Sequence, residues 1–324
     1  MPSPAISRSA PLVSVMIPVY EPNHFLLKTL NGVLQQTGDF PDGAMQIVLL
    51  DDASPTVDVR SLTLSVADIN HVDIRRNASN LGLARNWNQA IESAQGEFIH
   101  ILHQDDVVLP DFYKTMCTAL QRHPEAGMAF CRHAIIGADD EVQRISHRER
   151  WRSGILSNWL ARIAMRTRIQ CPAALVRRST YQAIGNFRTD LKYALDWEMW
   201  VRIAVHYPVW YETKMLALYR RHANNESARL AGSGEQEPDL FKAIETFSRY
   251  LPDEQRNKLA ISAYEYFVRS RLKQSRKLIA VNQHEAARRL LVHVSTAVSY
   301  LPEGRDKRLV QKQLVSLSAL SQAG

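Results

Sequence analysis

The sequence predicts an α/β protein in which a mixed, mostly parallel sheet is flanked by helices and is followed by a helical C-terminal region. Two observations favour this class. From residue 12 to about residue 225, short β-rich apolar runs alternate with segments of helical period. Beyond residue 226 the β-rich runs stop and amphipathic helical segments take over, with the linker ARLAGSGEQEPD at the transition. We therefore expect an N-terminal tail at residues 1–10, an α/β domain at 11–225 and a helical region at 226–324.

The N-terminal part of the α/β domain contains the clearest elements. Each predicted strand is a short run rich in β-branched residues, and each predicted helix repeats its apolar residues with helical spacing. Thr37-Gly38 and Gly96 supply stop signals after the two helices. In order, the predicted elements are strands at residues 12–17, 46–50, 72–75 and 97–102, with helices at 26–34 and 83–94.

Acidic residues follow two of these strands at the point where each strand ends. Asp51 and Asp52 follow the second strand, and Asp105 and Asp106 follow the fourth. Ligands of open α/β sheets bind outside the carboxyl ends of the strands, and paired carboxylates suit Mg²⁺ or Mn²⁺ bound together with substrate phosphates. A turn at Asp51-Asp52 and helix capping by Asp105-Asp106 are competing explanations. We expect the two strands to be neighbours in the sheet, which favours a shared ligand site.

Composition excludes several classes of protein. The three cysteines, Cys117, Cys131 and Cys171, lack the spacing of a disulfide framework or a zinc site, so we expect buried, reduced thiols. No apolar run approaches the roughly 20 residues that span a bilayer. The N-terminal residues lack the features of a signal peptide. We therefore expect a cytoplasmic protein.

The chain is basic, with a net charge of +7 and a pI near 9.4, which favours an anionic partner. None of the motifs that mark nucleic-acid-binding domains is present, so we expect no nucleic-acid partner. The basic amphipathic segments after residue 226 are compatible with peripheral contact at the inner face of the plasma membrane, with a lid, or with a repeat-like pair. Packing of their apolar faces within the protein is the commonest role of such helices.

Six sequence strings, taken together and in this order, resemble family 2 glycosyltransferases of the GT-A fold, of the bacterial surface-polysaccharide type. The strings are VSVMIPVYEP, IVLLDDASPT, NLGLARNWNQAI, FIHILHQDDVVLP, ALDWEMWVRIA and LYRRHANNES. The resemblance implies an inverting enzyme that moves a sugar from a nucleoside-diphosphate sugar to a hydroxyl of a glycan or lipid-linked acceptor. It also implies Mn²⁺ or Mg²⁺ as cofactor.

Carried onto this sequence, the resemblance implies a role for particular residues. It places Asp196 as the catalytic base, and Asp106 and His222 at the metal. The residues that it places along the nucleotide are Pro18, Tyr20, Asp51, Asn80, Arg85, Asp105 and Arg221. Helix entry is an equally good account of the Leu81-Gly82 step beside Asn80.

The chain departs from the family pattern at three places. Glu21 stands where Asn is usual, the acidic motif reads QDD, and Leu195 replaces the acidic residue that commonly precedes the base. Without that neighbouring charge Asp196 is expected to be a weaker base, and Glu198 is an alternative. The basic stretch at residues 137–169, which includes Arg148 and Arg152, is expected on the acceptor side.

Two other functions compete with sugar transfer. A non-catalytic protein that binds nucleotide sugars or scaffolds a partner is the alternative, but the acidic residues and His222 are all retained. A dinucleotide-dependent oxidoreductase is disfavoured, because no GxGxxG motif follows the first strand.

Overall fold

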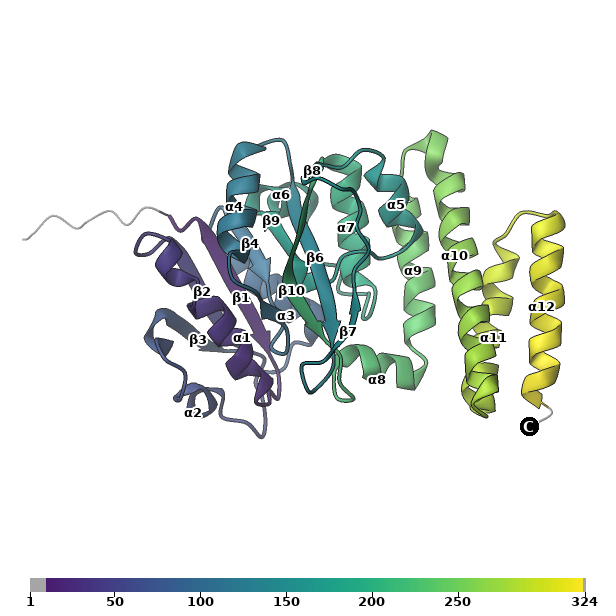
Figure 1. Cartoon of the computed structure of the whole chain (residues 1–324), viewed down its shortest axis with the longest axis horizontal. Coiled ribbons are helices and arrows are strands. Elements are labelled where there is room, and N and C mark those ends of the chain that lie inside the picture. Colours follow the sequence, from purple (N-terminus) through teal and green to yellow (C-terminus); the bar gives the residue numbers. More distant parts are fainter. Residues whose placement is uncertain (1–9, 323–324) are drawn as a thin grey trace, which may run out of the picture. The chain divides into compact units, whose positions relative to one another are not determined.

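A computed structural model describes residues 10–322, which form two compact units (Figure 1). The first unit comprises the described residues up to Ser157 together with Ile169–Asp190 and His206–Ala223. The second comprises Asn158–Arg168, Leu191–Val205 and the described residues from Asn224 onward. The division predicted at residue 225 is close to the start of the last segment, but the second unit also takes two earlier segments.

The first unit is built on a ten-stranded sheet, whose main path has the order β3-β2-β1-β4-β9-β6-β10-β5. Strands β1, β2, β3 and β4 run parallel, as do β6 and β10, whereas β9 is antiparallel to both β4 and β6. The predicted mixed, mostly parallel sheet is therefore confirmed. The strands are β1 (Val13–Val19), β2 (Met45–Asp51), β3 (Val72–Arg76), β4 (Phe98–Ile101), β5 (Val107–Val108), β6 (Met128–Ile136), β7 (Val142–Ile145), β8 (Gly154–Ile155), β9 (Ala174–Arg177) and β10 (Val209–Arg220).

Helices cover both faces of the sheet. The side chains of Val13, Val15 and Ile17 join one core cluster with apolar residues of α1 and α4, while α3 also contacts β1. All seven residues of β1 are buried, which explains its continuous apolar sequence. The helices of this unit are α1 (Phe25–Leu34), α2 (Val59–Thr63), α3 (Leu83–Ser93), α4 (Phe112–Arg122) and α6 (Arg178–Ile184), with 3₁₀ turns η1 (Thr37–Asp39), η2 (Ile69–His71) and η3 (Cys171–Ala173).

The four strands and two helices predicted in the N-terminal part are confirmed, with ends that differ by one or two residues. The expected pairing of the second and fourth strands is wrong, because β1 lies between β2 and β4. Apolar periodicity reports which residues are buried, but it does not report the order in which strands pair. The carboxyl ends of all three strands nevertheless lie along one edge of the sheet, because the strands are parallel.

The regular secondary structure among the described residues of the second unit is helical. Two short segments, at α5 and α7, cluster with the C-terminal helices, and the long α10 packs against α9, α11 and α12. Phe241 of α9 meets Phe267 of α10 edge to face, at 4.7 Å between ring centroids. The helices are α5 (Trp159–Met165), α7 (Leu195–His206), α8 (Glu226–Ser233), α9 (Gln236–Ser248), α10 (Asp253–Ala280), α11 (His284–Ser299) and α12 (Arg305–Gln322).

Two expectations from composition concern the whole chain. Cys117, Cys131 and Cys171 are buried thiols, as expected. Among residues 10–322, no helix combines the length and the apolar character that crossing a membrane requires.

Candidate active site

Hydrogen bonds join the loops that follow β1, β2 and β4. The backbone N–H of Tyr20 donates to the side-chain oxygen of Gln104 (2.9 Å), and the Gln104 amide donates back to the Tyr20 carbonyl (3.0 Å). Glu21 has a left-handed backbone, with φ of 45°, and its N–H donates to Ser54 Oγ. Its carboxylate accepts hydrogen bonds from the N–H and hydroxyl of Thr56. These hydrogen bonds with Thr56 lower the pKa of Glu21. The three loops thus form one connected platform.

Asp51 ends β2 with a buried carboxylate. One carboxylate oxygen accepts hydrogen bonds from the N–H and hydroxyl of Ser54, at 3.0 and 2.5 Å, and the other pairs with the Arg76 guanidinium. The side chain therefore forms the turn that was the competing explanation for this residue. Its contact with the nucleoside stays a prediction, as does that of Pro18, which is buried in β1 and pairs with Leu50 in register.

Asp52 organises the loop before α3, a role that the sequence analysis did not identify. Its carboxylate accepts hydrogen bonds from the Asn77 amide (2.8 Å) and from the N–H groups of Leu81 and Gly82 (both 2.9 Å). Gly82 is the N-cap residue of α3 and has φ of 80°, which glycine adopts without strain. The Leu81-Gly82 step is thus a helix entry.

The residues at this helix entry that were predicted to line the nucleotide, Asn80 and Arg85, have exposed side chains. Tyr20, on the loop after β1, is also half exposed, at 46% of its side-chain surface. These three groups are therefore accessible to a ligand at the edge of the sheet.

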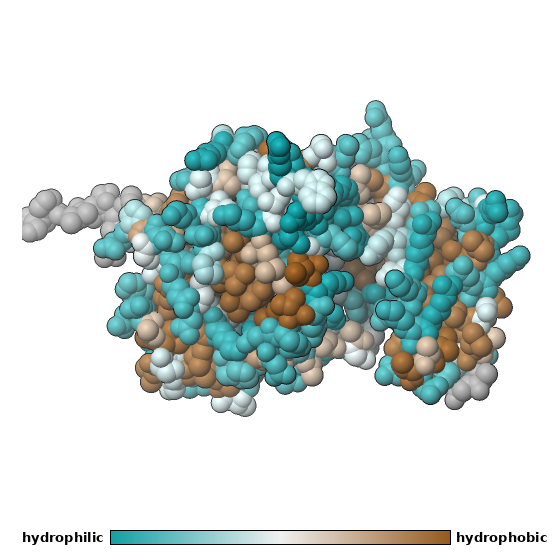
Figure 2. Space-filling model, in the orientation of Figure 1, coloured by the Kyte–Doolittle hydropathy of each residue, from teal (hydrophilic) through white to brown (hydrophobic). Residues whose placement is uncertain are grey.

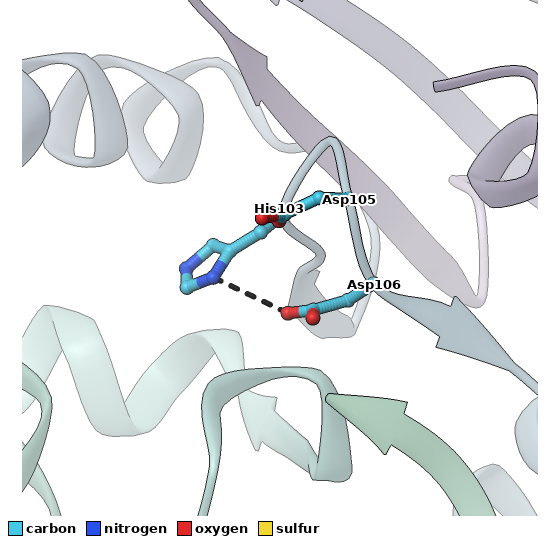
Figure 3. A group of neighbouring side chains, drawn as sticks. All are labelled: His103, Asp105 and Asp106. Carbon is cyan, nitrogen blue, oxygen red and sulfur yellow. Dashed lines mark ion pairs between the residues drawn. The ribbon is translucent and has the colours of Figure 1, made fainter. Parts of the chain in front are cut away.

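The acidic motif lies in the turn between β4 and β5, where Figure 3 shows the side chains of His103, Asp105 and Asp106. Asp106 is fully buried, and His103 Nδ1 lies 3.3 Å from its Oδ2. Its Oδ1 accepts a hydrogen bond from the backbone N–H of Arg220 (2.8 Å). Burial, followed by the charge of Asp105, raises the pKa of Asp106 to about 6. The N-cap residue of α4 is Asp111, so the motif does not cap that helix.

Arg220, the last residue of β10, supports this turn from a fully buried position. Its Nε donates to the Asp105 carbonyl (2.9 Å), and its Nη1 donates to the Gly137 carbonyl (3.0 Å) and to Asp140 Oδ1 (2.6 Å). Its guanidinium also lies over the Phe25 ring, 4.4 Å from the centroid. Sequence reasoning selected the next residue, Arg221, whose side chain is exposed. The position of β10 determines which of the two adjacent arginines is buried.

His222 completes the cluster from the other side. Its Nε2 lies 2.9 Å from Asp105 Oδ2, whereas the sequence analysis grouped His222 with Asp106. Ligand atoms of His103, Asp105 and Asp106 lie within 4.8 Å of one another. Asp106 Oδ2 is buried, with His103 Nδ1 3.3 Å away, but it accepts no well-aligned hydrogen bond. Carboxylate oxygens with imidazole nitrogens form a donor set suited to Mn²⁺, so these residues fit a divalent cation.

Asp196 and Glu198 lie in the first turn of α7, in the second unit. Asp196 is half-buried, and its Oδ1 accepts a hydrogen bond from the N–H of Trp197 (2.6 Å). Glu198 is buried, where it pairs with Arg202 (2.9 Å) and accepts a hydrogen bond from the Tyr250 hydroxyl. Glu198 is therefore tied to structural partners, which disfavours it as an alternative base. The role of Asp196 stays a prediction.

The loop after β7 is basic and aromatic. Trp151 exposes 83% of its surface, and the Arg148 guanidinium lies 5.3 Å from the centroid of its ring. Arg150 donates to the Ile155 carbonyl (2.8 Å), and Arg152 is exposed. A large exposed ring among cations is a surface that can contact an anionic or sugar ligand.

The chain is similar in sequence to a known family and to curated proteins. The model of the family Glycosyl transferase family 2 matches residues 14–185. An uncharacterised protein of Mycobacterium tuberculosis (strain CDC 1551 / Oshkosh) is 26% identical over 247 residues, which cover 70% of this chain and 72% of that protein.

Two solved structures have a similar fold. The S. aureus TarS 1-349 structure in complex with UDP-GlcNAc has a TM-score of 0.70 at 14% identity, covering 96% of this chain and 90% of that chain. Mannosyltransferase PcManGT from Pyrobaculum calidifontis, in complex with GDP-Man and Mn²⁺, has a TM-score of 0.57 at 16% identity, covering 97% and 85%. The predicted GT-A fold is thereby confirmed. Because the family model spans more than half of its length, the chain belongs to glycosyl transferase family 2.

Proposed function

We propose that the protein transfers a sugar, with inversion, from a nucleoside-diphosphate sugar to a hydroxyl acceptor, using Mn²⁺ or Mg²⁺. The observation that carries this proposal is the group of His103, Asp105 and Asp106 at the carboxyl edge of the sheet, which Arg220 and His222 bind through Asp105 and Asp106. Family membership supports the transfer of a sugar. The TarS complex with UDP-GlcNAc and the PcManGT complex with GDP-Man and Mn²⁺ support the donor class and the cofactor.

In this proposal Asp106 and His222 hold the cation, and Asp105, which pairs with His222, contacts the donor ribose. When bound, the cation offsets negative charge on the diphosphate leaving group. Arg220 keeps the acidic turn in place, because it binds the turn through both backbone and guanidinium groups. The nucleotide lies along the platform, with its remaining contacts at Pro18, Tyr20, Asp51, Asn80, Arg85 and Arg221.

Asp196 acts as the base in this proposal. An inverting transfer needs one carboxylate, which takes the proton of the acceptor hydroxyl as that oxygen attacks the anomeric carbon. The hydrogen bond from Trp197 N–H gives one oxygen of Asp196 a defined direction.

The acceptor in this proposal is a glycan or a lipid-linked glycan used in bacterial cell-surface polysaccharide synthesis, at the inner face of the plasma membrane. Arg148 and Arg152 supply positive charge for a diphosphate-linked lipid, and Trp151 supplies an exposed ring. Charge reversal at Arg148 or Arg152 is expected to weaken binding of a pyrophosphate-linked acceptor and to leave donor binding unchanged.

The first test is thermal unfolding with uridine, guanosine, deoxythymidine and cytidine diphosphates, each with and without Mn²⁺. A ligand at a hundred times its dissociation constant stabilises the folded state by about 2.7 kcal/mol. We expect a metal-dependent shift with one nucleotide, which Asp106→Asn loses and Asp111→Asn keeps. Asp111 is a matched control because its side chain is exposed. Its backbone has φ of 68°, a conformation that Asn tolerates.

The second test separates binding from chemistry. Asp196→Asn is expected to keep the nucleotide-dependent shift but to lower turnover of the cognate donor by about 10²- to 10⁴-fold. Full turnover in this variant would place the base elsewhere. A nucleotide-dependent shift with no turnover in the wild-type chain, either with acceptors or by donor hydrolysis, would instead indicate the non-catalytic nucleotide-sugar-binding protein.

A further inference from the structure

The excess positive charge of the chain lies entirely in its last three helices and the turns between them. Residues 253–324 contain thirteen Lys and Arg against six Asp and Glu, whereas residues 1–252 contain twenty-seven of each. The net charge of +7 is thus the charge of the segment that begins with α10 and includes α11 and α12. The unit that carries the acidic cluster contributes none of this excess.

The exposed face of α12 combines basic and apolar residues. At 100° per residue, the buried residues Leu317 and Ser321 lie on one face of the helix. Val315 lies on the opposite, outer face and Leu309 at its margin, where they expose 71% and 54% of their surface, whereas the exposed Leu320 lies beside the buried face. The basic side chains on the same outer face are Arg305, Arg308 and Lys312. The acidic residue of the helix, Asp306, lies on the side of the buried residues, away from this outer face.

The basic surface continues onto α10. Exposed Lys and Arg side chains recur along this helix at Lys258, Arg269, Lys273, Arg276 and Lys277. The Arg276 guanidinium donates to the side chain of Gln313 in α12 (3.0 Å), so the basic stripe of α10 borders α12. Val281 and Val292 add exposed apolar surface at the end of α10 and on α11. Figure 2 shows apolar residues, in brown, among hydrophilic ones on the visible face of these helices.

We propose that the outer faces of α10 and α12 bind the surface of an anionic lipid bilayer. Aliphatic side chains among cations suit the boundary between headgroups and acyl chains, where the apolar groups enter the membrane and the cations meet lipid phosphates. Nucleic-acid backbones use the cations but offer no partner for exposed Leu and Val side chains. A second copy of the chain would bring two surfaces of the same charge together. The proposal extends the lipid-linked acceptor of the proposed function, but its test does not depend on the reaction.

The test is co-sedimentation of the full chain with vesicles of phosphatidylcholine alone or of an equal mixture with phosphatidylglycerol. We expect binding to the anionic vesicles only, and loss of binding at salt on the order of 1 M, where the Debye length is about 3 Å. Arg308→Glu/Lys312→Glu should weaken binding at least about 30-fold. The matched control Lys114→Glu/Arg122→Glu, on exposed positions of α4, should bind like the wild type.

A second variant tests the apolar contribution. Leu309→Ser/Val315→Ser keeps every charge and should weaken vesicle binding about tenfold or more. These positions are exposed, so the thermal unfolding of both α12 variants should match that of the wild type. Nucleotide-dependent stabilisation, measured on the same samples, reports binding at the donor site separately. Failure of the proposed donor binding is therefore distinguishable from failure of membrane binding.

Several outcomes would overturn the proposal. Absence of binding to anionic vesicles at low salt would do so, as would unchanged binding of the α12 charge variant. The chain could instead bind a DNA duplex in a charge-dependent way. If the Leu309→Ser/Val315→Ser variant kept that binding in full, the surface would be assigned to nucleic acid. If light scattering gave the mass of a dimer for the wild type and of a monomer for both α12 variants, the surface would be assigned to a second copy of the chain.

Discussion

His222 Nε2 lies 2.9 Å from a carboxylate oxygen of Asp105, although 117 residues separate them in the chain. A second contact joins the same two segments, because the backbone N–H of Arg220 donates to Asp106. The end of β10 therefore binds both acids of the motif, one through a backbone group and the other through an imidazole. In the sheet, β9 and β6 lie between β4 and β10. The contact between β4 and β10 is therefore made by the residues that follow β4 and those at the end of β10.

The His222–Asp105 contact predicts non-additive effects on Mn²⁺-dependent nucleotide binding. His222→Ala and Asp105→Asn should each weaken it, and the double variant should lose less than the sum of the two losses. Coupling of about 0.5–3 kcal/mol is typical of residues in direct contact. Titration of nucleotide with Mn²⁺ in the four proteins of the cycle measures this energy. Strictly additive losses would mean that the two residues act on the ligand independently.

Arg220 and its neighbour offer a matched pair. Arg220→Lys should lower the free energy of unfolding by about 2–4 kcal/mol, because Lys cannot reproduce the forked contacts with two carbonyls and a carboxylate at a fully buried position. Arg221→Lys, at an exposed position, should change it by less than about 0.5 kcal/mol. Urea denaturation measures both. Equal stability of the two variants would contradict the structural role of Arg220.

Asp52 should stabilise the loop that precedes α3. Asp52→Ala removes the acceptor for two backbone N–H groups and the Asn77 amide, which should lower the free energy of unfolding by about 2–3 kcal/mol. Amide hydrogen exchange should accelerate most at Leu81 and Gly82. Asp58→Ala, at the exposed N-cap of α2, is the control and should have a smaller effect on stability without altering exchange at those two amides.

His100 predicts acid sensitivity of the fold. Its Nε2 donates to the Pro172 carbonyl and its Nδ1 accepts from the Tyr113 hydroxyl, both at 3.1 Å, which defines a neutral tautomer. Burial lowers the pKa of His100 from the ordinary value of 6.5 to about 3. The unfolded chain therefore takes up the proton first. The stability associated with neutral His100 is fully present above about pH 6.5 and is lost progressively as the pH falls toward about 3.

The measurement for His100 is the free energy of unfolding between pH 7 and pH 5. The free energy of unfolding of the wild type minus that of His100→Gln should fall as the pH is lowered. At the acid end of this range, the slope of this difference should approach about 1.4 kcal/mol per pH unit. His24→Gln, which removes an exposed imidazole, controls for the loss of a histidine as such. Parallel curves for wild type and His100→Gln would show that this imidazole does not govern the acid response.

The strands and helices of the N-terminal part could be predicted from sequence because each is signalled by local periodicity. The strand order could not, since β1 separates β2 from β4 through pairings that no local pattern encodes. Arg220 was missed for a related reason. Its buried position depends on the register of β10 with β6, which places Arg220 opposite Ile136.

Glu21 shows how a departure from the family pattern can be explained only with the backbone in view. The residue has φ of 45°, a conformation in which Asn, the usual family residue, is enriched. Glu is less suited to that conformation, but its carboxylate bonds to Thr56 and accepts a weaker hydrogen bond from the N–H of Val57. The sequence reveals the substitution, whereas the compensating contact depends on a loop 35 residues away.

The platform formed by the loops after β1, β2 and β4 constrains how the donor side of this enzyme can change in evolution or by engineering. Gln104 bonds to the backbone of Tyr20, and Glu21 bonds to Ser54 and Thr56, so each loop carries the partner of another. A single loop taken from a relative would arrive without its partners. Grafts that alter donor preference should therefore succeed when all three loops are exchanged together, and Glu21 and Thr56, whose side chains bond to each other, should co-vary among relatives.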